Sequence, residues 1–165
     1  MKKSILFNFT VDKQNKKIKV ERSFNAPLDL VWKAWTESEV LDQWWAPKPW
    51  RAETKSMDFK EGGQWHYAMI GPDGEKQWCL HDFKSVESKK SFSGLDAFCD
   101  KHANINNTKP RAFWNNVFND HSNSTIVNIE ISFDEPENLE TIIAMGFKEG
   151  FAMGLENLDH YLSSH

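Results

Sequence analysis

Residues 64–81 read QWHYAMIGPDGEKQWCLH, two runs of strand-forming residues around a turn rich in glycine and proline. This pattern is typical of a β-hairpin. With Pro72 and Asp73 at the tip, Tyr67 lies opposite Trp78, because paired residues are equally distant from the turn. One face of the hairpin then carries large apolar side chains: Trp65, Tyr67, Met69, Trp78 and Leu80. We therefore predict that this face points inward.

The other face of the predicted hairpin is mostly polar. It carries Gln64, His66, Ala68, Gln77, Cys79 and His81. Zinc binds cysteine and histidine side chains, so Cys79, His66 and His81 are candidate ligands. Zinc sites usually show tighter ligand spacing than this, and the face is predicted to meet solvent. We interpret it as a half-exposed polar face and expect no metal site.

The hairpin belongs to a longer region of strands. Alternating apolar residues and turn residues continue from Trp50 to Phe133, which predicts an antiparallel meander. Gly62-Gly63 marks an earlier turn, and residues 125–133 form a clear last strand that residues 141–143 could extend. The pattern does not fix the strand phase between Asp100 and Asn123.

Helical signals stand on both sides of the meander. A strand at residues 18–24 is followed by two short helices, at about 27–35 and 36–46. From Gly146, apolar residues recur at helical spacing for about 17 residues, or about 26 Å of helix, enough to cross a sheet. Gly150 and Gly154 on this helix indicate room for close packing, or for a ligand.

Length and composition predict one domain and exclude some classes of partner. The 165 residues divide into an N-terminal extension, residues 1–15, and one domain, residues 16–165. The net charge of −4 argues against nucleic-acid binding, which needs a basic surface. No run of about 20 apolar residues or signal peptide is visible, so we expect a cytoplasmic protein with no membrane insertion. We expect the oligomeric state to be a monomer or a homodimer.

Several short motifs resemble a known family in their order and spacing. They are Phe24-Asn25-Ala26-Pro27, Val31-Trp32-Lys33-Ala34-Trp35-Thr36, Leu41-Asp42-Gln43-Trp44-Trp45-Ala46-Pro47, Gly62-Gly63, Met69 with Gly71-Pro72-Asp73-Gly74, and Gly146-Phe147 with Gly150. The chain resembles the family named for the C-terminal domain of the activator of heat-shock protein 90 ATPase. That family has the helix-grip fold of the birch-pollen allergen, START domains and polyketide cyclases. One departure is His81, where the family usually carries glycine.

The resemblance implies an α+β helix-grip fold, in which a curved antiparallel sheet holds a long C-terminal helix on its concave face. Two short helices follow the first strand of that fold. The family shares no catalytic residue set, so the resemblance implies binding rather than a reaction.

We expect an aromatic pocket between sheet and helix for a small apolar or amphipathic ligand, with no cofactor. The candidate ligand-binding residues are Trp35, Trp44, Trp65, Tyr67, Met69, Trp78, Leu80, Phe147 and Phe151. One alternative is a co-chaperone-like protein that contacts a chaperone ATPase. Another is a cyclase-like enzyme in which Asp58 or Glu61 moves a proton, although surface charges are the simpler interpretation of these two residues.

Overall fold

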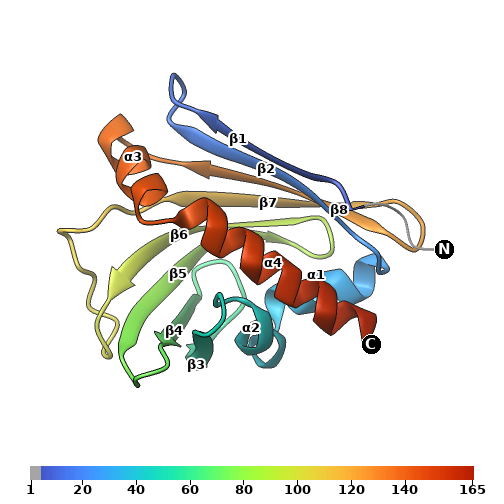
Figure 1. Ribbon diagram of the computed structural model, residues 1–165, viewed down its shortest axis with the longest axis horizontal. Helices are drawn as coiled ribbons and strands as arrows, with labels where there is room; N and C mark the ends of the chain where they lie inside the picture. The colour runs from blue at the N-terminus through green and yellow to red at the C-terminus, as the bar shows by residue number, and fades with distance from the viewer. Residues whose placement is uncertain (1–4) are drawn as a thin grey trace.

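The computed structural model describes residues 5–165, which form eight strands and four helices (Figure 1). The elements are, in order, β1 (Phe7–Asp12), β2 (Lys17–Phe24), α1 (Leu28–Thr36), α2 (Ser38–Trp44), β3 (Arg51–Met57), β4 (Gln64–Ile70), β5 (Lys76–Glu87), β6 (Ser91–Cys99), β7 (Phe113–Asp120), β8 (Thr125–Ser132), α3 (Pro136–Ala144) and α4 (Phe147–Ser163).

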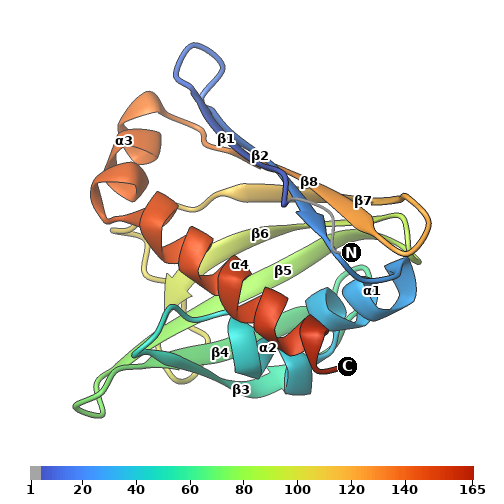
Figure 2. The same ribbon diagram turned by 45° about the vertical axis from the view of Figure 1, so that its right-hand side comes forward.

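All eight strands join one antiparallel sheet in the order β1-β2-β8-β7-β6-β5-β4-β3. The sheet curves around α4, which runs across its concave side, while α1 and α2 lie near the C-terminal end of α4 (Figures 1 and 2). This arrangement confirms the predicted α+β helix-grip fold. Helices α1, α2 and α4 form where the sequence predicts them.

The strands β2 and β8 lie next to each other and share a buried face. Ile18 pairs with Ile131 and Val20 with Ile129, and each of these four side chains is at most 3% exposed. The alternating residues Lys19 and Glu130 point away from the core, as period-two patterning requires.

Two stretches differ from the prediction. Residues 7–12, expected to be part of an extension, form the edge strand β1, in which Phe9 packs against the core. Residues 141–143, expected to extend the last strand, belong to helix α3 instead. Pro136 occupies the first turn of α3, where its fixed φ suits a helix. Leu139, on the same helix, is buried.

The predicted register of the β4–β5 hairpin is wrong by one residue. Gly71 N–H donates to the Glu75 carbonyl at 2.8 Å, and Gly74 N–H donates to the Gly71 carbonyl at 3.0 Å. Gly74 has φ +85°, in the left-handed region, so the loop holds three residues, with a left-handed glycine as its third. The extra loop residue shifts every residue pair between β4 and β5 by one position.

In the observed register, Tyr67 pairs with Cys79 and Ala68 with Trp78. Because side chains alternate between the two faces, a shift of one residue turns the whole of β5 over relative to β4. Trp78 and Leu80 therefore lie on the outer face, away from α4, and Cys79 and His81 lie on the inner face. His66 is on the outer face too, where its Nε2 is 3.0 Å from the Asp100 carbonyl oxygen.

Helices α2 and α4 contact each other closely at Gly154. A Cβ atom at that position would come within 3.3 Å of the carbonyl oxygens of Trp44 and Trp45. The nearby Asn157 side chain is buried, and its Nδ2 donates to the carbonyls of Trp44 (3.4 Å) and Ala46 (3.1 Å). Asn157 thus satisfies carbonyls at the end of α2 that have no helical partner. Gly154 serves packing, the first of its two predicted roles.

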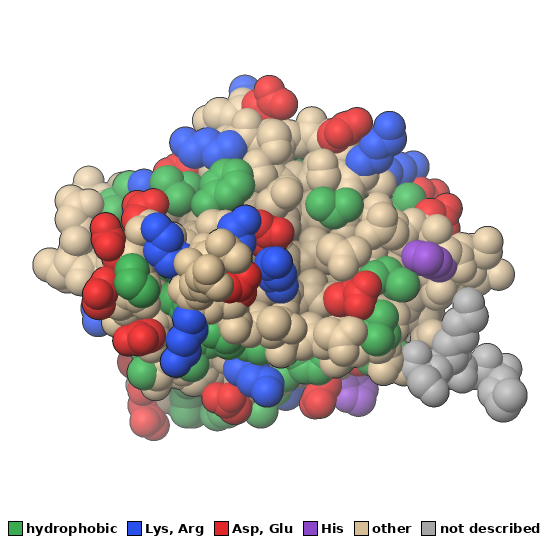
Figure 3. All heavy atoms as spheres, turned by 90° about the horizontal axis from the view of Figure 1, so that it is seen from above, with side chains coloured by type: hydrophobic (Ala, Val, Ile, Leu, Met, Phe, Trp, Pro, Cys, Tyr) green, Lys and Arg blue, Asp and Glu red, His purple; other side chains and the backbone are tan. Residues whose placement is uncertain are grey.

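Acidic and basic side chains are interspersed on the face of the molecule seen in Figure 3. Within the described residues, none of the helices is long and apolar enough to cross a membrane.

Candidate functional site

A cavity of about 450 Å³ lies between the concave face of the sheet and α4. Its walls come from β4 to β8, from α3 and α4, and from the segment that follows α2. The residues that line it include Trp45, Tyr67, Met69, Cys79, Asp96, Ala112, Trp114, Phe147, Gly150 and Phe151. Most of the lining is apolar, with a few polar groups on the sheet side.

Of the nine predicted ligand-binding residues, four line this cavity: Tyr67, Met69, Phe147 and Phe151. Trp65 lies just beside it, with its ring stacked on that of Tyr67 at a centroid distance of 4.0 Å. Trp35 and Trp44 pack against each other in the core near α2, with centroids 5.0 Å apart. Trp78 and Leu80 are on the outer face, for the register reason given above.

Trp45 is a central wall residue that is not among the nine predicted ligand-binding residues. Its ring lies 5.6 Å from Trp65, 5.8 Å from Trp114 and 6.2 Å from Phe151, centroid to centroid. Its Nε1 donates to the Tyr67 hydroxyl oxygen at 3.0 Å. Trp45 is the C-terminal capping residue of α2, directly after the last helical residue, and its side chain forms part of the cavity wall.

Asp96, on β6, is the polar residue that sequence reasoning missed. Its Oδ1 accepts from Ala112 N–H at 2.7 Å and its Oδ2 accepts from Trp114 Nε1 at 2.8 Å. Asp96 lines the cavity and is partly exposed, although protein atoms surround its carboxyl group closely. This burial raises the pKa of Asp96 to about 6, against the opposite effect of the two hydrogen bonds and of Arg111.

Two neutral polar groups lie near Asp96. Burial raises the pKa of the Cys79 thiol to about 12 and holds the pKa of the Tyr67 hydroxyl well above its usual value. Both groups are therefore protonated at neutral pH. They offer hydrogen bonds to a ligand but no charge.

His81 fills the position where glycine is usual in the resembled family. It pairs with Asp96 across β5 and β6, and its ring stacks on Trp65 at 5.5 Å and meets Trp114 edge-on at 5.8 Å. Burial lowers the pKa of His81 to about 4, so the ring is neutral at pH 7. The side chain occupies space beneath the cavity that a glycine would leave open.

Asp58 and Glu61, the acids considered for cyclase-like proton transfer, lie outside the cavity. Asp58 forms an exposed salt bridge with Lys60 at 3.4 Å, and Glu61 Oε1 is 3.5 Å from the Val86 N–H, also at the surface. The surface interpretation of both residues agrees with the structure. Asp96 is the carboxyl group that a ligand in the cavity would meet.

Replacing Asp96 with asparagine should change stability in a pH-dependent way. The folded-state pKa is raised from 3.8 to about 6, so ionisation of Asp96 costs stability as the pH rises through that range. At about 1.4 kcal/mol per pKa unit, the cost reaches about 3 kcal/mol at pH 7.5, and the lost hydrogen bond offsets about 1–2 kcal/mol. We expect Asp96→Asn to be about 1 kcal/mol more stable than the wild type at pH 7.5.

Urea unfolding at pH 7.5 and pH 5 measures this effect. The advantage of Asp96→Asn should fall by about 1 kcal/mol at pH 5, where Asp96 is mostly protonated in the folded wild type. His81 titrates in both proteins, so it largely cancels from the difference. The exposed Asp58→Asn variant is the control, and an equal pH trend there would contradict the assignment to Asp96.

Known proteins are similar to this chain in sequence and in fold. A model of the family described as "Activator of Hsp90 ATPase homolog 1-like protein" matches residues 25–163. A comparison with curated protein sequences gave no match.

Solved structures of bacterial proteins are similar over nearly the whole chain. The crystal structure of protein Ms6760 from Mycobacterium smegmatis is 26% identical, with a TM-score of 0.87 over 96% of this chain and 97% of that one. The solution structure of a protein from Arthrobacter aurescens is 26% identical, with a TM-score of 0.90 over 96% and 92%. A protein from Silicibacter pomeroyi, 16% identical over 90% and 99%, shares the fold with a TM-score of 0.72.

Proposed function

Because the chain belongs to the family of activator of Hsp90 ATPase homolog 1-like proteins, we propose that it is a non-catalytic binding protein for a small apolar or amphipathic molecule. The cavity between the sheet and α4 carries this proposal. Its volume of about 450 Å³ is in the range of about 300–1,000 Å³ that is usual for small-molecule sites.

The composition of the cavity wall fits the same role. Trp45, Trp114, Phe147 and Phe151 supply rigid apolar surface, while Tyr67 supplies a polar contact. Burying apolar ligand surface against such rings is favourable by about 25 cal/mol per Å². The rings would therefore give affinity, and the few polar groups would orient the ligand.

Filling the cavity from α4 should weaken binding. Gly150 lies in the wall, and a Cβ there would meet only Pro47, at an ordinary contact distance of 3.7 Å. Gly150→Leu should fit the helix, place its side chain in the cavity and weaken binding of the neutral dye N-phenyl-1-naphthylamine at least tenfold. Fluorescence titration of the dye measures this.

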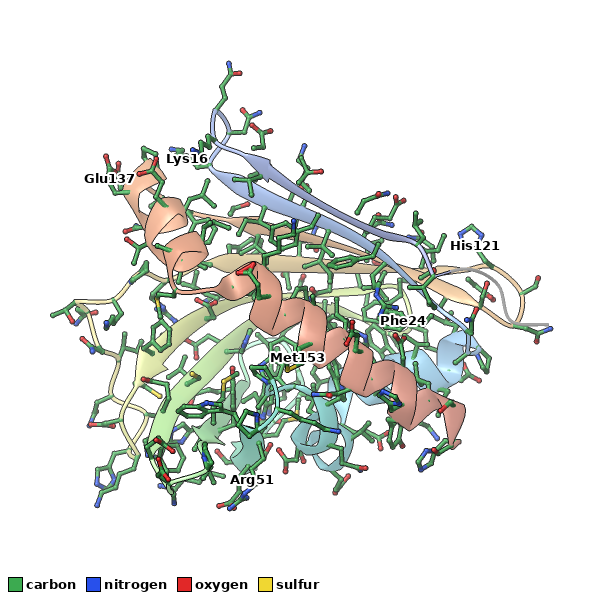
Figure 4. All side chains as sticks on the ribbon, in the orientation of Figure 1. Lys16, Phe24, Arg51, His121, Glu137 and Met153 are labelled. Carbon is green, nitrogen blue, oxygen red and sulfur yellow. The ribbon has the colours of Figure 1, made fainter. Side chains whose placement is uncertain are left out.

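Met153→Leu is the matched control, because Met153 lies on the same helix (Figure 4). Its side chain is 41% exposed. It should bind the dye like the wild type. If Gly150→Leu binds the dye as tightly as the wild type does, the dye occupies another site and the proposal is wrong. Native mass spectrometry of protein purified from its own host would identify a bound ligand directly.

The co-chaperone alternative makes a different prediction. A chain that acts on a chaperone ATPase should change the rate of ATP hydrolysis by the host chaperone. Gly150→Leu separates the two roles, because it alters the cavity and leaves the outer surface intact. Stimulation that persists in Gly150→Leu would favour the co-chaperone role over the cavity.

A further inference from the structure

The wall of the cavity contains one ionisable group that is charged at pH 7.5, and that group is negative. Among the described residues that line it, Asp96 is the only aspartate, glutamate, lysine, arginine or histidine. Tyr67 and Cys79 are protonated at this pH, as shown above. A ligand in the cavity therefore meets a single carboxylate in an otherwise uncharged site.

The protein holds this carboxylate in place but does not neutralise it. The hydrogen bonds from Ala112 and Trp114 use one acceptor position on each oxygen, and a carboxylate oxygen has a second. Asp96 is also among the residues that line the cavity, which is where a ligand group would use the remaining positions.

Arg111, the cation whose charge acts on Asp96, has other partners. Nη2 of Arg111 donates to Oδ2 of Asp82 at 2.8 Å, and its Nε donates to the backbone oxygen of Asp96 at 2.8 Å, not to the carboxylate. His81, opposite Asp96 in the sheet, is neutral. Among the described residues, none forms a salt bridge with Asp96. Arg111 stabilises the charged form of Asp96 only from a distance, so a buried carboxylate without a salt bridge remains costly, and a positively charged ligand group would reduce that cost.

The surrounding rings favour the same kind of group. Trp114 donates to Asp96 and lies 5.8 Å from Trp45 and 5.6 Å from Phe151, and Phe147 stacks on Phe151 at 5.2 Å. Aromatic faces attract cations through their quadrupole, and most strongly where water is excluded. The same rings also provide apolar surface on which the apolar part of a ligand can be buried.

We propose that the cavity selects amphipathic amines, with the ammonium group at the Asp96 carboxylate and the apolar part among the rings of Trp45, Trp114 and Phe151. This inference rests on the proposed binding function and names its ligand class. It predicts that anionic amphiphiles of the same shape are disfavoured, because they would place a second negative charge near Asp96.

Three probes that share one ring system test the selectivity: 2-(2-naphthyl)ethylamine, the neutral 2-(2-naphthyl)ethanol, and the anion 2-naphthylacetate. Isothermal titration calorimetry at pH 7.5 gives each dissociation constant. We expect the amine to bind at least tenfold more tightly than the alcohol, and the acetate to bind most weakly. In Asp96→Asn, the amine should lose at least tenfold while the alcohol changes less than threefold. Asp58→Asn removes the same charge at the surface and should leave all three constants unchanged.

The outcomes separate this inference from the proposed function. Binding of none of the three probes to the wild type would overturn both. Equal binding of amine and alcohol, or an equal loss of both in Asp96→Asn, would overturn the amine selectivity and leave the apolar cavity in place. The preference within the wild type needs no variant, so the test stands even if Asp96→Asn folds poorly.

Discussion

Replacing Trp44 with alanine is expected to lower the free energy of unfolding by about 4 kcal/mol, because it removes a large ring from the core. Trp44 is 1% exposed, and its ring packs against Trp35 at 5.0 Å and Trp45 at 5.2 Å. Its Nε1 also donates to the Ala34 carbonyl at 2.8 Å, which ties α2 to the end of α1. Urea or thermal unfolding measures the loss.

Trp44→Phe separates the two contributions of this side chain. It keeps most of the packing and removes the hydrogen bond, so we expect a smaller loss, of about 1–3 kcal/mol. The sequence instead predicted Trp44 as a ligand-binding residue. A Trp44→Ala protein that keeps its stability to within about 1 kcal/mol but loses dye affinity would support that role, against the core position described here.

Replacing Asp159 with alanine should cost about 3 kcal/mol, because it leaves a buried guanidinium without its partner. The Arg22 side chain is 4% exposed, and it donates to Asp159 through Nη1 (3.1 Å) and Nη2 (2.6 Å). The pair joins β2 to α4 across the core. Asp159 is 31% exposed, so water can replace part of the lost interaction and the value lies at the low end for buried pairs.

Two further variants test this explanation through their free energies of unfolding. Glu156→Ala, at an exposed position on the same helix, is the control. The double variant Arg22→Met with Asp159→Ala removes both charges of the pair. Glu156→Ala should change stability by less than about 0.5 kcal/mol. The double variant should be more stable than Asp159→Ala alone, because the buried charge is gone. A double variant that is less stable than Asp159→Ala alone would contradict a charge-based explanation.

Elements with one apolar face were predictable from the sequence. β2, β8 and α4 each bury one side and expose the other, so their periodicity is visible in the residues themselves. Arg22 occupies the apolar phase of β2, a position where a guanidinium must either reach solvent or be paired. The structure shows that it is paired and buried, with the partner supplied by a helix 137 residues later.

The sequence could not show how the hairpin and the cavity wall come together. Whether Gly74 adds a residue to the turn depends on its φ, and that choice decided which face carries Trp78. Asp96 lies in a strand whose alternation is interrupted at Gly94, so its direction had no clear signal. Its role depends on Trp114, 18 residues away.

The order of strands in the sheet also affects how the chain folds during synthesis. β2 is made early but pairs with β8, and the Lys17–Glu130 ion pair between them spans 113 residues. Contacts so distant in sequence close late, because the intervening loop entropy is lost before they form. When the chain is made from its N-terminus, β2 can pair with β1 early, but its other edge has no partner until β8 has left the ribosome. During that interval the free edge of β2 presents unpaired backbone groups, the feature that makes partly folded chains prone to aggregation.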